Sequence, residues 1–214
     1  MKKLIFLLTF LLYSQIILSW PTGPDVNGVV IFNSTTAADQ TIALGIRPSA
    51  EMAATNGNVA TSQSANYEEA TGIAYKFPDG NWMDATTPGC LCEGWGAGAV
   101  DQFGREFHGE ADKYHGSPSN VLVKSFVHDE TSISSRTWIN DPSGNAVMEV
   151  IHQFGPSTLR PNELFEAIVT ITNISGNTLT DVRYNRTMDW DIPPTEFSEI
   201  VTIVGAANSH AATT

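Results

Sequence analysis

The sequence predicts an all-β protein, an antiparallel β-sandwich with little helix after its first residues. Most patterned segments alternate apolar and polar residues with a period of two, which is typical of strands buried on one face. Residues that favour turns separate these segments at short intervals, as they do in antiparallel sandwiches. Beyond the N-terminus, no segment combines an apolar helical stripe with helix caps.

The N-terminus has the pattern of a secretory signal peptide over residues 1–19. Lys2 and Lys3 precede the apolar run Leu4–Leu18, which is shorter than a membrane-spanning helix. The alternative is an uncleaved membrane anchor. Residues 20–214 are then expected to form a single β-sandwich domain, for which their length is ordinary. The pattern predicts a secreted, extracellular or cell-surface protein.

The net charge of the chain limits the kinds of partner that we expect. The chain has 11 Lys and Arg against 23 Asp and Glu, a net charge of −12. Cleavage after residue 19 removes two lysines, which leaves 9 against 23 and a charge of −14. Nucleic acids and anionic membranes attract basic surfaces, so we expect neither as a partner. No apolar run after the signal is long enough to span a membrane, so no span is expected in the mature chain. Glycans or proteins of the cell surface or matrix stay as candidate partners.

The first half of the mature chain is expected to begin with strands at Gly28–Asn33 and Thr41–Ile46. Pro48–Ala70 is polar, rich in small residues and without a sustained period, so it predicts a long surface loop. Arg105–Gly116 contains His108, Asp112 and His115, which only a helix would align for zinc. Glycines within and beside this stretch disfavour a helix and predict a polar loop.

The second half is expected to hold two β-hairpins. One joins Ser132–Asn140 to Ala146–Phe154 through the turn Asp141–Asn145, and the other joins Glu163–Asn173 to Thr178–Asp191 through Ser175–Asn177. Further strands are expected at Val121–His128 and Glu199–Gly205. His152 alternates onto an apolar face, which predicts a packed histidine.

Asp189 and Asp191 are the candidate metal ligands. On a strand they share one face, and two carboxylates at this spacing can chelate a hard cation such as Ca²⁺. Calcium takes 6–8 oxygen ligands, so neighbouring loops would have to complete the site. The alternatives are an ion pair between Asp189 and Arg183, a cap on the following turn, or a pair of glycosidase carboxylates, which would require a cleft.

Cys90 and Cys92 are the only cysteines, within the stretch GCLCEGWG. Three interpretations stay open: a local disulfide, two thiols packed beside Trp95, or a metal or redox function. Zinc needs four ligands and two thiols supply half of them, whereas an oxidising compartment and flexible glycines favour a disulfide. We expect the stretch to form a clasp that seats Trp95 against the core.

Asn33, Asn173 and Asn185 begin N-x-[ST] sequons, which are glycosylation sites if the host uses them. A sugar-binding surface would be favoured if Trp82, Trp95 or Trp138 were exposed on one face of the protein.

Three stretches together resemble a known family: TIALGI, GCLCEGWG, and the long segment Val169–Ile203, which includes MDWDIPPTEF. They are similar to secreted bacterial surface proteins of uncharacterised function, which often carry a PEP-CTERM-type sorting tail. The resemblance covers roughly Thr41–Ile203. It implies an extracellular β-sandwich, with no catalytic residues to transfer. Members of the family continue past the strand that matches Glu199–Ile203, so the resemblance implies a truncated part of a larger supersandwich.

The sequence therefore predicts a secreted or surface-associated, non-catalytic β-sandwich protein with a structural, adhesive or matrix role. No catalytic residue and no cofactor other than calcium are expected. A carbohydrate-binding module, calcium-assisted through Asp189 and Asp191, is the alternative. A carbohydrate-active enzyme of a β-supersandwich fold is the third hypothesis, and it would need a cleft lined by convergent acids.

Overall fold

The computed structural model describes residues 27–59, 70–86, 88, 93–112 and 118–200. In these residues the regular structure consists of eleven β-strands and one three-residue 3-10 helix, η1 (Ala37–Asp39). The strands form three antiparallel sheets, and the prediction of an all-β sandwich is confirmed.

The strands are named in chain order and listed here in their spatial order. The first sheet contains β1 (Val29–Phe32), β2 (Ile42–Ile46), β3 (Ile73–Lys76) and β4 (Trp82–Asp84). The second contains β10 (Phe165–Asn173), β9 (Ala146–Pro156), β8 (Ile133–Asn140) and β7 (Val121–His128). The third contains β11 (Leu179–Met188), β5 (Glu93–Asp101) and β6 (Glu106–Asp112).

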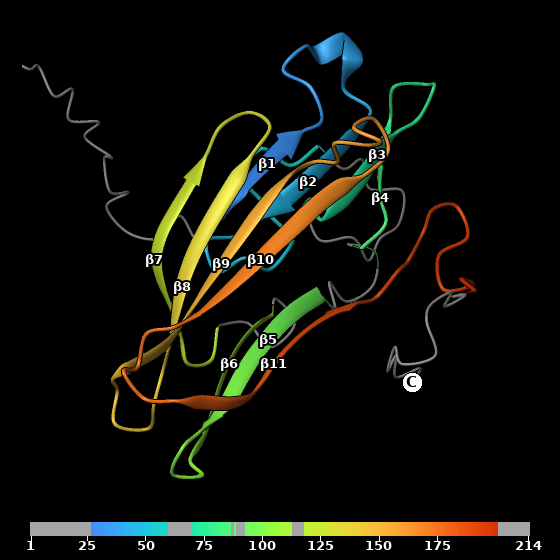
Figure 1. Ribbon diagram of the computed structural model, residues 1–214. Coiled ribbons are helices and arrows are strands. Elements are labelled where there is room, and N and C mark those ends of the chain that lie inside the picture. Colours follow the sequence, from blue (N-terminus) through green and yellow to red (C-terminus); the bar gives the residue numbers. More distant parts are fainter. Residues whose placement is uncertain (1–26, 60–69, 87, 89–92, 113–117, 201–214) are drawn as a thin grey trace, which may run out of the picture.

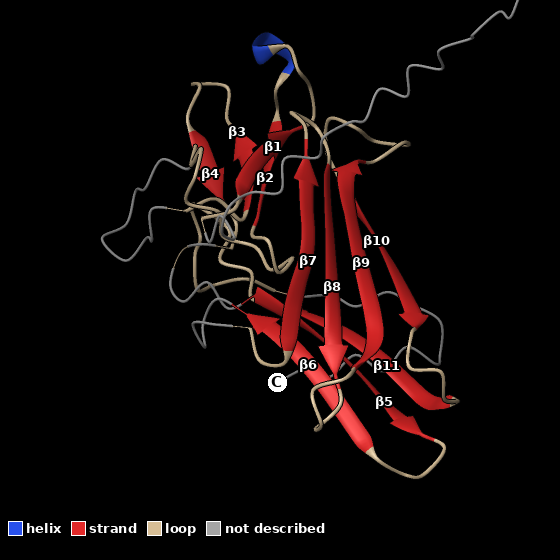
Figure 2. Cartoon of the chain, turned by 90° about the vertical axis from the view of Figure 1, so that its left-hand side faces the viewer, coloured by secondary structure: helices blue, strands red, loops and turns tan. Residues whose placement is uncertain are grey.

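The second sheet runs along the whole molecule, and the other two lie against it toward opposite ends (Figures 1 and 2). One apolar core joins all three. It includes Leu44 from the first sheet, Trp95 from the third, and Ile139, Met148 and Val150 from the second. The three sheets therefore share one buried interior, which fixes their relative positions.

The hairpin formed by β8 and β9 is confirmed, with the turn between Asn140 and Ala146 as expected. The inward face of β9 holds Met148, Val150, His152 and Phe154, all of them buried. His152 is the packed histidine that the alternation predicts: it is fully buried, its Nε2 lies 3.1 Å from the Tyr184 hydroxyl, and its ring lies 4.5 Å from that of Trp95.

The second expected hairpin is wrong in its pairing, although both strands exist. β10 pairs with β9 and β11 pairs with β5, so the segment between them carries the chain from one sheet to the other. We call this segment, residues 174–178, the arch. Val169 of β10 and Tyr184 of β11 both pack against the shared core, so the two strands face one another across it.

The expected polar loop at Arg105–Gly116 and the expected strand at Glu199–Gly205 both differ from the described structure. Arg105–Gly116 is not a polar loop, because it contains β6, which pairs with β5. A Cβ at Gly109 would lie 2.7 Å from the Asn120 carbonyl oxygen, so this glycine permits close packing within the sheet layers. Glu199 and Ile200 are not in a strand, and the rest of the strand expected at Glu199–Gly205 lies outside the described residues.

The expected surface loop at Pro48–Ala70 is wrong for its first seven residues. Residues 48–54 are buried, and Glu51 is only 2% exposed. We call residues 47–54 the core segment. Ala50 and Ala53 adopt left-handed backbone conformations, with φ of 74° and 78°, which are strained for residues that carry a Cβ. Composition predicted exposure because the segment is made of small residues, but small residues also fit between packed sheets.

Side chains from the second and third sheets satisfy the backbone of the core segment. Its carbonyl oxygens accept hydrogen bonds from three side chains on three strands: Ser135 Oγ to Pro48 at 2.6 Å, Trp95 Nε1 to Ser49 at 2.7 Å, and Arg186 Nη2 to Ala50 at 3.0 Å. The Met52 N–H donates to Glu93 Oε2 at 2.6 Å. These bonds satisfy buried backbone groups that the two isolated bridges of the segment, Ile46 with Met52 and Ala54 with Thr71, do not pair.

Glu93 and Arg186 form a buried ion pair beside the core segment. Arg186 Nε lies 2.6 Å from Glu93 Oε1, and the two side chains are 17% and 3% exposed, respectively. Burial raises the pKa of Glu93, and the Arg186 charge opposes that shift. The two charges compensate one another in a poorly solvated interior. Loss of one partner would therefore leave the other charge buried without a counter-ion.

We predict that Arg186→Met lowers the free energy of unfolding by about 3–5 kcal/mol, because Glu93 is then buried without its cation. Arg183→Met is the matched control on the same strand: Arg183 is largely exposed and pairs with Asp181 at the surface, so little change is expected. Urea denaturation of both variants provides the test. Equal stability of the two variants would contradict a structural role for the buried pair.

Burial of His152, with the nearby Arg186 charge, holds its pKa at about 3, far below its ordinary value of 6.5. The folded protein therefore binds fewer protons than the unfolded chain, and the stability that this group contributes is present above pH 6.5 and is lost as the pH falls toward 3. We predict that His152 alone accounts for a loss of about 2 kcal/mol between pH 7 and pH 5.

His152→Gln removes this titration while other groups are unchanged, so the difference between the two proteins isolates the histidine. The free energy of unfolding of the wild-type protein should depend more steeply on pH than that of the variant over this range. Parallel pH profiles would show that His152 is not buried in its neutral form.

Candidate ligand-binding pocket

Three turns of the described residues share one sequence pattern. Each begins with Asp or Asn and has glycine three residues later: DQFG at Asp101–Gly104, DPSG at Asp141–Gly144 and NISG at Asn173–Gly176. The glycines have φ of 78°, 86° and 75°, a left-handed conformation that glycine adopts without a steric cost. The pattern recurs at the β5–β6 turn, the β8–β9 turn and the arch.

Side-chain hydrogen bonds hold each turn in place. Oδ1 of the first residue accepts the N–H of the third, from Phe103 at 2.8 Å, from Ser143 at 2.9 Å and from Ser175 at 3.0 Å. In the first two turns the same oxygen also accepts the N–H of the fifth residue, Arg105 at 3.0 Å and Asn145 at 2.9 Å. Such bonds fix short loops in one conformation.

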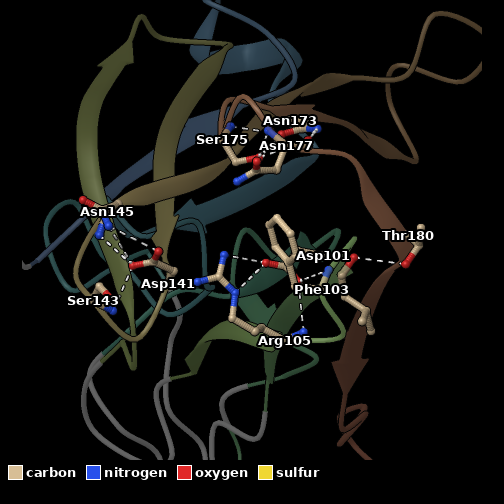
Figure 3. A network of polar contacts seen from close by, with 11 residues as sticks. Asp101, Phe103, Arg105, Asp141, Ser143, Asn145, Asn173, Ser175, Asn177 and Thr180 are labelled. Atoms are coloured by element: carbon tan, nitrogen blue, oxygen red, sulfur yellow. Dashed lines mark hydrogen bonds and ion pairs between the residues drawn. The ribbon is translucent and has the colours of Figure 1, made fainter.

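The three turns meet at one end of the sandwich, where they surround a pocket of about 300 Å³ (Figure 3). We call this the turn pocket. Its apolar lining includes Phe107, Val147 and Leu179, which also belong to or border the core. Its polar lining comes from all three turns and consists of Asp101, Arg105, Asp141, Ser143, Asn145, Ser175 and Asn177. The pocket therefore combines an apolar base with a polar rim.

Arg105 is the cation of the turn pocket. Its Nε and Nη2 lie 2.7 Å and 2.6 Å from Asp101 Oδ2, and its guanidinium lies between Asp101 and Asp141 in Figure 3. Burial would raise the pKa of Asp101, but hydrogen bonds from Arg105 and Phe103 outweigh it and lower the pKa. The hydrogen bond from the Asn145 backbone is the largest cause of the lowered pKa of Asp141, and the Arg105 charge acts in the same direction. Both carboxylates are ionised at neutral pH.

The predicted calcium ligands lie away from this pocket and do not share a face. β11 ends at Met188, so the strand alternation stops before the pair. Asp189 is exposed, whereas Asp191 is 6% exposed and its N–H donates to Ala85 O at 2.9 Å. In the described part of the chain, no group of three or more His, Cys, Asp or Glu residues is placed to hold a metal ion. Backbone oxygens or water would have to complete a calcium site.

The other predicted residues are dispersed. Cys90 and Cys92 lie outside the described residues, so the clasp stays a prediction, while Trp95 is buried and its Nε1 donates to Ser49 O. Trp82 packs edge-to-face on Phe32 in the first sheet. Trp138 lies on the second sheet with Lys124 over its ring at 4.0 Å. The tryptophans therefore do not form one platform.

The three sequons differ in their surroundings. Asn33 uses both ends of its amide: Oδ1 accepts the Thr41 N–H at 2.8 Å, and Nδ2 donates to Asn162 at 3.0 Å. Asn173 Nδ2 donates to the Asn177 carbonyl at 2.7 Å, inside the arch. Asn185 is exposed on β11. A glycan at either of the first two sites would have to accommodate these bonds, and use of the sequons stays a prediction.

Comparisons with family models, curated proteins and solved structures find no match for this chain. Among the described residues, no helix is long and apolar enough to cross a membrane. The signal for the turn pocket was present in the sequence as the recurring [DN]-x-x-G pattern, but the sequence could not indicate which of its occurrences meet.

A calcium role for Asp189 and Asp191 predicts that millimolar Ca²⁺ raises the melting temperature relative to chelator. The physical reason is local charge: burial raises the pKa of Asp191, and the nearby carboxylates of Asp189, Glu199 and Glu196 raise it further. A cation would relieve this repulsion. The double variant Asp189→Asn, Asp191→Asn should remove the shift, and identical melting of the wild-type protein in calcium and in chelator would contradict the calcium hypothesis.

Proposed function

We propose that this is a secreted or surface-associated, non-catalytic β-sandwich protein with a structural, adhesive or matrix role, and that it binds its partner through the turn pocket. The observation that carries the proposal is the convergence of three internally braced turns on one pocket. Loops held by a rigid β scaffold are the usual location of binding residues. The N-terminal signal pattern, with Lys2, Lys3 and the apolar run, supports secretion.

The chemistry of the turn pocket favours binding over proton transfer. A general acid needs a raised pKa, whereas the pKa values of Asp101 and Asp141 are both lowered. Asp101 accepts four hydrogen bonds or charge contacts from its own turn, which leaves it little capacity to act on a substrate. The same bonds make the turns rigid, and rigid loops lose less conformational entropy when a ligand binds.

We predict that Ser143→Tyr, which places a bulky ring at the mouth of the turn pocket, releases the protein from the cell surface or matrix. Fractionation of cells that produce the protein measures its partition between surface material and medium. Ser143 contributes only its backbone N–H to the turn, so the variant should fold, with a melting temperature near that of the wild type.

Ser132→Tyr is the matched control. Ser132 is exposed in the β7–β8 turn, at the other end of β8, and its backbone N–H likewise donates to an aspartate, Asp129, at 2.7 Å. This variant should be retained like the wild type. Equal retention of both tyrosine variants would contradict binding through the turn pocket, and wild-type protein that stays in the cytoplasm would contradict secretion.

A further inference from the structure

We propose that the turn pocket binds a neutral saccharide. This inference rests on the proposed function, because it assigns a ligand class to the same pocket. Three properties of the pocket carry it: its balanced charge, the hydrogen-bonding groups that its turns leave available, and its apolar base.

The charges of the pocket disfavour ionic ligands of either sign. An anion would approach Arg105, but Asp101 already neutralises that guanidinium at 2.6 Å and Asp141 adds a second negative charge nearby. A cation would approach the two carboxylates, but Arg105 lies between them (Figure 3). Asp101 is also saturated by donors from its own turn. A ligand without net charge avoids both conflicts.

The rim presents donors and acceptors that have no partner within the described part of the protein. Asn177 forms hydrogen bonds within the arch only through its backbone. Its side-chain amide bonds to no residue in the described part of the protein. Asn145 Nδ2 makes long contacts of 3.3 Å and 3.4 Å with Asp141, while its Oδ1 accepts no hydrogen bond from the residues that the structure describes. Sugar hydroxyls both donate and accept, so they match such a mixed rim.

The base and size of the pocket fit a sugar ring. Phe107 and Val147 are 6% and 7% exposed, and with Leu179 they present apolar surface beneath the polar rim. A pyranose has the same division, with C–H groups on its faces and hydroxyls around its edge. A volume of about 300 Å³ is at the lower end of small-molecule sites, which suits a monosaccharide or disaccharide. An extended peptide would instead require a sheet edge or a long groove.

The test is a titration of the ¹⁵N-labelled mature chain with glucose, galactose, mannose, N-acetylglucosamine and cellobiose, followed by ¹H–¹⁵N spectra. Glucuronate and glucosamine serve as the anionic and cationic counterparts. We expect at least one neutral sugar to shift the amide signals of the three turns, such as those of Phe103, Ser143 and Ser175. The charged sugars should bind more weakly.

Asn177→Ala should weaken that binding about tenfold, because one hydrogen bond to the ligand is lost. It should leave the melting temperature unchanged, because the bonds of the arch come from the Asn177 backbone. Asn56→Ala is the matched control: Asn56 is an exposed turn residue between β2 and β3 that does not line the pocket, so its substitution should leave binding unchanged.

Two outcomes would overturn the saccharide proposal: no shift of turn amides with any neutral sugar at millimolar concentration, or tighter binding of a charged sugar. The surface-retention experiment separates this failure from that of the proposed function. If Ser143→Tyr still abolishes retention while sugars fail, the ligand class is wrong and the pocket stays the binding site. If Ser143→Tyr is retained and no neutral sugar binds, both proposals fail. If Ser143→Tyr is retained while a neutral sugar shifts the turn amides, only the proposed function fails.

Discussion

Hydrogen bonds from side chains of three strands hold the core segment between the sheets, and they fix how the second and third sheets pack around it. Within the described residues the segment makes only isolated bridges, between Ile46 and Met52 and between Ala54 and Thr71. The carbonyl groups of Pro48, Ser49 and Ala50 lie between the two residues of the first bridge and accept no backbone hydrogen bond there. Ser135, Trp95 and Arg186 supply the missing donors. Buried polar side chains thus occur where backbone groups need them, which explains why polar residues occupy inward positions of otherwise apolar strands.

The ion pair between Glu93 and Arg186 links this constraint to the turn pocket. Glu93 begins β5 and also accepts the Met52 N–H, while Arg186 lies on β11, the neighbour of β5. The far ends of these two strands lead into the β5–β6 turn and the arch, which line the pocket. The position of the pocket therefore follows from how firmly β5 and β11 are fixed to the core segment. The same two strands, β5 and β11, thus connect the polar contacts in the centre of the sandwich to the turn pocket at its end.

Local patterns predicted the strands better than their pairing. The alternation through Ala146–Phe154 identified β9, and the turn at Asp141 identified its hairpin, because both signals are local. The turn at Ser175–Asn177 has similar chemistry but joins two sheets, and turn residues alone do not distinguish a hairpin from an arch. The core segment was missed because small residues are equally common on surfaces and in tight interiors, and only the surrounding sheets decide between them.

For the candidate site too, local sequence patterns predicted the separate turns but not how they come together. The pattern [DN]-x-x-G occurs four times in the sequence, once at Asp25–Gly28 and three times in the turns of the pocket. It predicts turns and not their convergence, which depends on the sheet topology. Conversely, the spacing of Asp189 and Asp191 suggested a shared face, but β11 ends before it reaches them. Residue spacing indicates which groups can act together only as far as the regular element continues.

Hydrogen exchange at the Met52 amide tests most directly whether the core segment is the central constraint. Its N–H donates to the buried Glu93 carboxylate at 2.6 Å, so it should exchange only when the whole sandwich unfolds. We predict that its protection equals that of interior amides of β8 and β9 and falls in parallel with stability in Arg186→Met. Exchange as fast as that of the exposed turn residue Gly57 would contradict the account, because the segment would then open independently of the sheets.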